Sequence, residues 1–148
     1  MSVKEFIYKY LPHANAVAIK HGVPALVTLS QAAWESGWGR SAPKYNFFGM
    51  TAGNNYSGKV QYLSTFEYMN GQKVKVKRAF RAYDNPVHAF NDYAINLATK
   101  QNYREAFQYR RGNPEMFLRK VCEGGYATDP NYLINTLKVM KMIKKYVV

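Results

Sequence analysis

One dipeptide, Asn70-Gly71, constrains the fold of this chain more than any other feature. It separates two runs of alternating side chains, 60–68 and 73–83. Asn-Gly between two such runs is typical of the type I′ turn of a β-hairpin. The remaining periodic sequence is helical, because its apolar residues recur three and four positions apart. The sequence therefore predicts an α+β fold that is mainly helical and carries one small hairpin.

Local signals place the ends of the first two helices. Ser2 followed by Glu5 forms a capping-box pattern, and Gly22 is a natural C-terminal stop. We expect Pro12, which lies between them, to bend or restart the helix. A core helix is predicted over residues 24–36, where apolar and small residues alternate at helical spacing.

Three Asn-Pro or Asp-Pro pairs, at 85–86, 113–114 and 129–130, predict further helices. The polar side chain can cap the helix, and proline fits its first turn. The predicted ranges are 86–99, 114–123 and 130–146, with another helix near 103–110. The glycine-rich stretch 37–58 has no periodicity and is predicted to be a long, functional loop.

Composition narrows the class of protein. The 148 residues predict one domain, 1–148. Because the chain has one cysteine, Cys122, it cannot be a secreted scaffold held by internal disulfides. The first ten residues carry Lys4, Glu5 and Lys9 where a signal peptide would be apolar, and no apolar stretch is long enough for a membrane span. The formal charge of +12 favours polyanionic partners such as wall polymers, membranes or nucleic acid.

Glu35 is the strongest candidate for acid chemistry among the nine carboxylates. It lies near the C-terminal end of the predicted core helix, between Trp34 and Trp38. Burial against indole disfavours the charged carboxylate, and so does the negative end of the helix dipole. Both effects raise the expected pKa of Glu35. A carboxylic acid that stays protonated near neutral pH can protonate a glycosidic oxygen.

Glu67 is the second candidate carboxylate, and the hairpin places it. A two-residue turn pairs Met69 with Gln72, and therefore Glu67 with Val74. Alternation then puts Glu67 on the aliphatic face, opposite the face that carries the lysines of 73–77. We therefore expect this carboxylate to point into a cleft and not to serve charge pairing. The three histidines are scattered, and no metal site is predicted.

Five segments carry a resemblance to a known family. They are Ala32-Ala33-Trp34-Glu35-Ser36-Gly37-Trp38-Gly39, Tyr45-Asn46-Phe47-Phe48-Gly49-Met50, Thr65-Phe66-Glu67-Tyr68, Phe80-Arg81-Ala82-Tyr83-Asp84 and Tyr126-Ala127-Thr128-Asp129-Pro130. In order and spacing they resemble the bacterial peptidoglycan N-acetylglucosaminidases of glycoside hydrolase family 73. These are wall-cleaving domains of autolysins, of the flagellar rod-cap protein and of some phage lysins. The resemblance covers essentially the whole chain, with Trp34 and Phe47 where the family often has leucine.

The resemblance implies a lysozyme-like helical domain with a hairpin lobe beside the active-site groove. It implies hydrolysis of the β-1,4 bond between N-acetylglucosamine and N-acetylmuramic acid. Glu35 matches the general acid, Glu67 the proposed second carboxylate and Tyr126 a cleft tyrosine that orients the substrate. The implied substrate-binding residues are Trp38, Asn46, Phe48, Gly49, Thr128 and Asp129. Inverting, retaining and substrate-assisted mechanisms all stay open.

The implied partners are peptidoglycan glycan strands, with no nucleic acid, no membrane span and no metal or organic cofactor. We expect a monomer that acts on the bacterial cell wall after secretion, export to the periplasm or delivery by a phage. One alternative is another lysozyme-fold wall hydrolase, either a muramidase or a lytic transglycosylase. A non-catalytic wall-binding module, suggested by the +12 charge and the 16% aromatic content, is the other.

Overall fold

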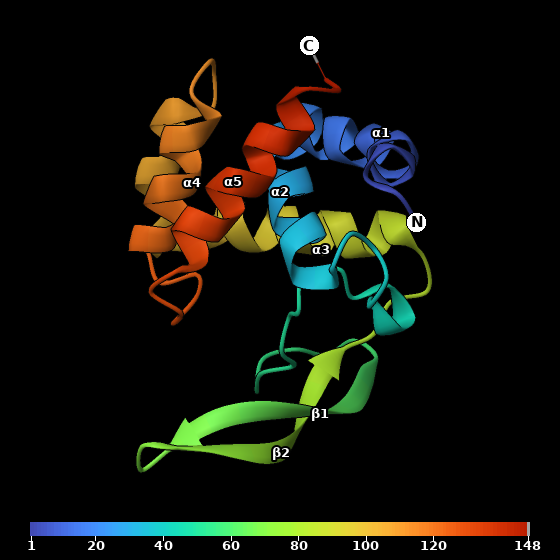
Figure 1. The fold of residues 1–148 in the computed structure, drawn as a ribbon, viewed down its shortest axis with the longest axis vertical. Coiled ribbons are helices and arrows are strands. Elements are labelled where there is room, and N and C mark those ends of the chain that lie inside the picture. Colours follow the sequence, from blue (N-terminus) through green and yellow to red (C-terminus); the bar gives the residue numbers. More distant parts are fainter. Residues whose placement is uncertain (148) are drawn as a thin grey trace.

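The computed structural model describes residues 1–147, without the side chain of Tyr68, and shows a helical body with a projecting hairpin (Figure 1). Val148, the last residue of the predicted domain, lies outside the described residues. The elements in chain order are α1 Val3–His21, α2 Ala25–Ser36, a 3₁₀ turn Pro43–Tyr45 (η1), β1 Val60–Met69, β2 Gln72–Arg81, α3 Pro86–Thr99, a 3₁₀ helix Gln101–Tyr109 (η2), α4 Pro114–Glu123 and α5 Tyr132–Lys144. The predicted class, α+β and mainly helical, is confirmed.

Helix α2 lies in the middle of the helical body, where it packs against α1, α4 and α5 (Figure 1). Its residues Val27, Leu29 and Ala32 are completely buried. The same core contains Phe90 from α3 and Met140 from α5. Burial of such side chains is the main favourable term in folding, so α2 is held firmly on several sides.

The predicted helix caps are confirmed at three of four places. The Ser2 hydroxyl accepts a hydrogen bond from the Glu5 amide at 3.1 Å. The side chains of Asn85 and Asn113 likewise accept from backbone amides at the starts of α3 and α4. The fourth prediction is wrong. Asp129 does not cap α5, because its carboxylate accepts from the Asn131 amide in a turn and the helix begins two residues later than expected.

Two further expectations need correction. Of the two outcomes expected at Pro12, a restart is wrong, since α1 is one helix from Val3 to His21, and a bend stays a prediction. Proline removes one helical hydrogen bond, which leaves the carbonyl of Tyr8, one turn earlier, without its helical donor. Tyr8 and Pro12 are both exposed, so water can bond to this carbonyl. The helix expected near 103–110 is a 3₁₀ helix that begins at Gln101.

The hairpin has the predicted register. Glu67 pairs with Val74 and Met69 with Gln72, in antiparallel strands. Asn70 and Gly71 have φ angles of +53° and +78°, as a type I′ turn requires. Since Asn-Gly tolerates these angles, the local sequence is enough to set the pairing of both strands.

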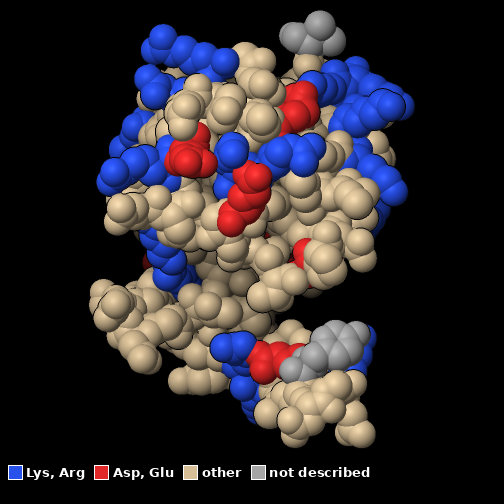
Figure 2. Space-filling view, turned by 90° about the vertical axis from the view of Figure 1, so that its left-hand side faces the viewer, with Lys and Arg blue, Asp and Glu red and all other residues tan. Residues whose placement is uncertain are grey.

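Polar contacts attach the base of the hairpin to the helical body. The Arg81 guanidinium, at the end of β2, forms an ion pair with Asp92 of α3 at 2.8 Å. The Tyr83 hydroxyl donates to the same carboxylate at 2.5 Å. The remainder of the hairpin extends away, and Figure 2 shows a hollow between it and the helical body.

Within residues 1–147, none of the helices combines the length and apolar character that crossing a bilayer requires.

Candidate active site

A pocket of about 270 Å³ brings the end of α2 together with the loop after it and with β2, α3 and η2. It is lined by Glu35, Phe48, Gly49, Met50, Thr51, Arg81, Asn96, Lys100, Tyr103 and Tyr126. Among these described lining residues, Glu35 alone has a carboxylate. Of the predicted site residues, the structure therefore gathers Glu35, Phe48, Gly49 and Tyr126 around one opening.

Glu35 combines an open side with a desolvated carboxyl group. The residue as a whole is exposed, because it faces the pocket opening. Burial of the carboxyl group against the surrounding protein nevertheless raises its pKa to about 7, and a hydrogen bond with the Tyr132 side chain opposes the rise. The two observations agree if water reaches the group from one side only. Glu35 is then half protonated near neutral pH and accessible to a ligand, as a general acid must be.

The predicted rise in pKa is confirmed, and burial is its largest cause, as predicted, but the two indoles do not face the pocket. Neither Trp34 nor Trp38 lines the pocket. Trp34 is 41% exposed, while Trp38 packs edge-on against Phe6 in the core, with 5.6 Å between ring centroids. The residues that share the pocket with Glu35 come from other parts of the chain.

Gly49 brings the backbone of the pocket wall close to the acid. A β-carbon built at this position would lie 3.1 Å from Glu35 Oε2, closer than ordinary van der Waals contact. The φ angle of Gly49 is +62°, a conformation that favours glycine. The backbone can therefore approach the carboxyl group only because residue 49 has no side chain.

The loop that presents Gly49 is supported by its neighbours on both sides. Phe48 is 3% exposed, and its ring stacks on Tyr93 of α3 with a centroid distance of 3.9 Å. Asn46 is 5% exposed, and its amide bonds to both backbone groups of Met50 and to the carbonyl of Arg81, at 3.0 Å each. Asn46 does not line the pocket, and its side chain shapes the loop.

Tyr126 closes another side of the pocket, between Tyr103 and Tyr132, at ring-centroid distances of 6.2 and 5.8 Å. Burial, with the neighbouring Tyr132 and Glu35 among the smaller contributions, raises the pKa of Tyr126 well above its ordinary value. The hydroxyl therefore stays protonated at neutral pH. It can donate a hydrogen bond to a bound molecule.

Glu67 does not line the pocket. Its carboxylate forms an ion pair with Arg78, from the same face of the hairpin. The expectation that Glu67 would not serve charge pairing is thus wrong. Alternation places Arg78 on this face as well, beside the aliphatic residues.

Three other predicted substrate-binding residues lie outside the pocket lining. Trp38 belongs to the edge of the core, and Thr128 and Asp129 are exposed in the loop before α5. The Asp129 side chain is engaged with the Asn131 amide at 2.9 Å. Their predicted role in substrate binding stays a prediction.

Several pocket residues were missed from the sequence. Arg81 belongs to one of the five segments that resemble the family, but it was assigned no role. Its guanidinium also donates to the Thr51 carbonyl and lies 4.5 Å from the Tyr56 ring centre. Asn96 and Lys100 look like ordinary polar residues of an amphipathic helix, and no local signal could have found them. Their position depends on how α3 crosses the end of α2.

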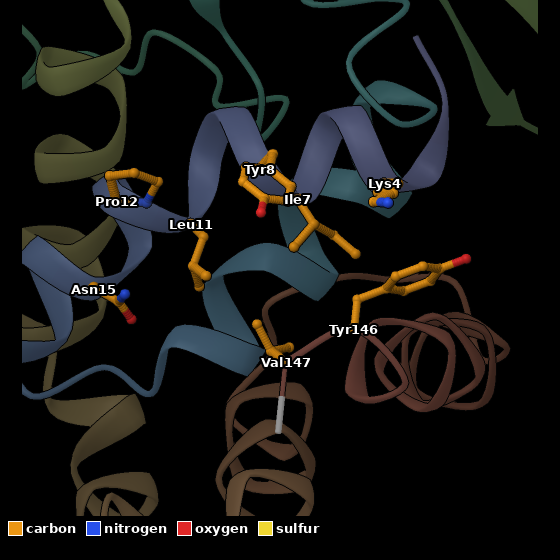
Figure 3. Close-up of a pocket in the computed structure, with 8 residues that line it drawn as sticks. All are labelled: Lys4, Ile7, Tyr8, Leu11, Pro12, Asn15, Tyr146 and Val147. Atoms are coloured by element: carbon orange, nitrogen blue, oxygen red, sulfur yellow. The ribbon is translucent and has the colours of Figure 1, made fainter.

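A second pocket, of about 540 Å³, opens between α1 and the C-terminal segment (Figure 3). Figure 3 shows Lys4, Tyr8 and Asn15 of α1 on one side and Tyr146 and Val147 on the other. This pocket is larger, but none of its described lining residues has an acidic side chain. Size alone does not make it the reaction site. Across residues 1–147, no group of three or more His, Cys, Asp or Glu side chains could hold a metal ion.

Comparison with known proteins identifies the family. The sequence profile of the Glucosaminidase family, described as mannosyl-glycoprotein endo-beta-N-acetylglucosaminidase, matches residues 11–147. The chain therefore belongs to the glucosaminidase family, as the sequence motifs predicted.

Individual relatives agree with this assignment. The chain is 37% identical to the peptidoglycan hydrolase FlgJ of Escherichia coli K12, over 95% of this chain and 47% of that protein. It is 36% identical to a probable N-acetylmuramidase of Lactococcus lactis, over 88% of this chain and 31% of that protein. The solved glycoside hydrolase domain of Salmonella typhimurium FlgJ superposes with a TM-score of 0.81 at 33% identity, covering 97% of this chain and 99% of that one. This chain spans less than half the length of the curated relatives that it matches.

Proposed function

We propose that this chain is a peptidoglycan hydrolase that cleaves the β-1,4 bond between N-acetylglucosamine and N-acetylmuramic acid, with Glu35 as the general acid. The observation that carries the proposal is a lone carboxyl group, with a pKa raised to about 7, facing an open pocket. The named activities of the FlgJ relatives support the choice of substrate.

In this mechanism Glu35 donates its proton to the glycosidic oxygen as the bond to the leaving sugar breaks. Tyr126, whose hydroxyl stays protonated, orients the sugar by donating a hydrogen bond. Phe48 and Gly49 form the wall that sets where the glycan can approach. Trp38, Asn46, Thr128 and Asp129 stay predictions as substrate-binding residues.

Glu67 is proposed as the second carboxylate, which activates water. It lies on the face of the hairpin expected to border the cleft, where its carboxylate pairs with Arg78. We propose the bacterial cell wall as the place of action.

The test is digestion of purified peptidoglycan by the wild type and by Glu35→Gln, followed by borohydride reduction and mass spectrometry of the fragments. We expect reduced N-acetylglucosamine ends with the wild type and none with Glu35→Gln. The control is Glu115→Gln, which removes an exposed carboxylate paired with Lys144 on the helical body. A fully active Glu35→Gln variant contradicts the proposal. Glu67→Gln should slow the reaction strongly if Glu67 activates water, whereas a mild effect favours assistance by the acetamido group of the substrate.

A muramidase is the second candidate, favoured by the printed name of the Lactococcus relative. It shares a catalytic glutamate but leaves reduced muramic acid ends. The same digestion separates the two enzymes by the identity of the reduced sugar.

A further inference from the structure

Gln31 is a fully buried polar residue one helical turn before Glu35. Its side chain has 0% exposure in the centre of α2, among apolar neighbours. Residues four apart lie on the same face of a helix, so Gln31 and Glu35 point in similar directions. A buried amide is unfavourable unless its hydrogen bonds are made, and therefore its partners are informative.

Two tyrosines from distant parts of the chain satisfy this amide. The Tyr93 hydroxyl of α3 donates to Gln31 Oε1 at 2.5 Å. Gln31 Nε2 donates to the hydroxyl oxygen of Tyr132, at the start of α5, at 3.2 Å. Both tyrosines are themselves buried, with exposures of 0% and 4%. Gln31 thus links three helices beneath the pocket.

The chemistry of the amide gives this network a direction. An amide oxygen only accepts and an amide nitrogen only donates. The short distance to Tyr93 suits an O–H···O bond, and the longer distance to Tyr132 suits an N–H···O bond. Tyr132 therefore accepts from Gln31 and keeps its own hydroxyl hydrogen for another acceptor.

Glu35 is the acceptor that the surroundings of Tyr132 offer. The Tyr132 side chain is close enough to the Glu35 carboxyl group to lower its pKa, against the effect of burial. The charge of Glu35 in turn contributes to the raised pKa of Tyr132, after burial. Two hydrogen bonds therefore run in one sense, from Tyr93 through Gln31 to Tyr132, and they leave the Tyr132 hydrogen free to turn toward Glu35.

We propose that Gln31 is a positioning residue, which holds the Tyr132 hydroxyl in the orientation that aims its hydrogen at Glu35. Gln31 itself touches neither the pocket nor the substrate. The inference rests on the proposed role of Glu35 as the general acid. It predicts that substitution of Tyr132 or of Gln31 changes the pKa of Glu35.

The test compares pH profiles of kcat/KM for glycan cleavage in Gln31→Met, Tyr132→Phe and the double variant. Methionine is close to glutamine in shape and fits buried sites. Losing a donor to the carboxylate disfavours the ionised form, so the alkaline limb of the profile should move to higher pH. Because orientation is also lost, the rate should fall on the order of tenfold. If Gln31 acts through Tyr132, the double variant should shift the limb no further than Tyr132→Phe alone.

Tyr93→Phe provides a second route if Gln31→Met does not fold. It removes one hydroxyl group and keeps the ring that stacks on Phe48. The Gln31 amide can then rotate and accept from Tyr132, which diverts the Tyr132 hydrogen from Glu35. We expect the same direction of shift in the alkaline limb.

Ser30→Ala is the matched control, because Ser30 is another fully buried polar residue of α2, bonded only to the Leu26 carbonyl. It should leave the pH profile unchanged. The other titratable groups that line the pocket, Arg81, Lys100, Tyr103 and Tyr126, are the same in all variants. They cannot cause a difference between them.

Wild-type pH profiles in both Gln31→Met and Tyr93→Phe, with only a lower Tm, overturn the inference and leave Gln31 a packing residue. An unchanged profile in Tyr132→Phe overturns it too. These outcomes are distinct from failure of the proposed function, which is an active Glu35→Gln variant.

Discussion

Gly49→Ala offers a direct test of how closely the backbone confines the acid. The φ angle of +62° places residue 49 in the left-handed region, where a β-carbon costs about 1–2 kcal/mol. For a chain of this size, such a loss lowers Tm by about 2–8 °C. The added methyl group would also lie 3.1 Å from Glu35 Oε2, so the carboxyl group must move by a few tenths of an ångström.

The effect on activity should exceed the effect on stability. Misplacing a catalytic group by about 1 Å can cost on the order of 100-fold in rate, so the smaller shift expected here should cost roughly tenfold. The methyl group also excludes water from Glu35, which disfavours the ionised form. We therefore expect the alkaline limb of the pH profile to move upward.

Gly112→Ala is the matched control. Gly112 has a φ angle of +79° in the loop before α4, and nothing lies within 4 Å of a β-carbon built there. The two variants should lose similar stability in thermal unfolding, while only Gly49→Ala loses activity in a reducing-end assay at saturating peptidoglycan. Equal activities and superimposable pH profiles would refute the reasoning.

Three further predictions follow from the site. Because Glu35 must be protonated to act and its pKa is raised to about 7, the rate of cleavage should fall as pH rises through about 7. A rate that does not change up to a pH well above neutral contradicts this. The raised pKa contributes stability that is fully present below the ordinary value of 4.5 and is lost as pH rises through about 7, so Glu35→Gln should gain Tm relative to the wild type between those limits. Tyr83→Phe removes a hydrogen bond to the Asp92 carboxylate and should destabilise the protein by about 1.5–3 kcal/mol, measured by denaturant unfolding; a variant of unchanged stability would show that Arg81 alone holds Asp92.

Features that depend on neighbouring residues could be predicted from the sequence. The Asn70-Gly71 turn set the hairpin register, and the caps at Asn85 and Asn113 set the starts of two helices. The same signal failed at Asp129, where the side chain prefers a turn with Asn131. A cap and a turn compete for the same oxygen, and local sequence does not decide between them.

The candidate acid could be found for a partly mistaken reason. Glu35 stood out beside two tryptophans, but neither of them lines the pocket, and burial raises its pKa. Glu67 was placed on the right face of the hairpin, yet its partner Arg78 was missed. Periodicity assigns a face, whereas the contacts made on that face depend on the length and direction of each side chain.

By itself, the sequence determined the helical body, the single hairpin and its register, and the residue that can act as acid. These depend on propensities and spacings within a few residues. Only the tertiary structure decided what surrounds Glu35. The hydrogen bonds of Gln31 join it to Tyr93, 62 residues away in the sequence, and to Tyr132, 101 residues away. Such contacts arise when α2, α3 and α5 pack into one core, and packing of distant segments leaves no trace in local periodicity.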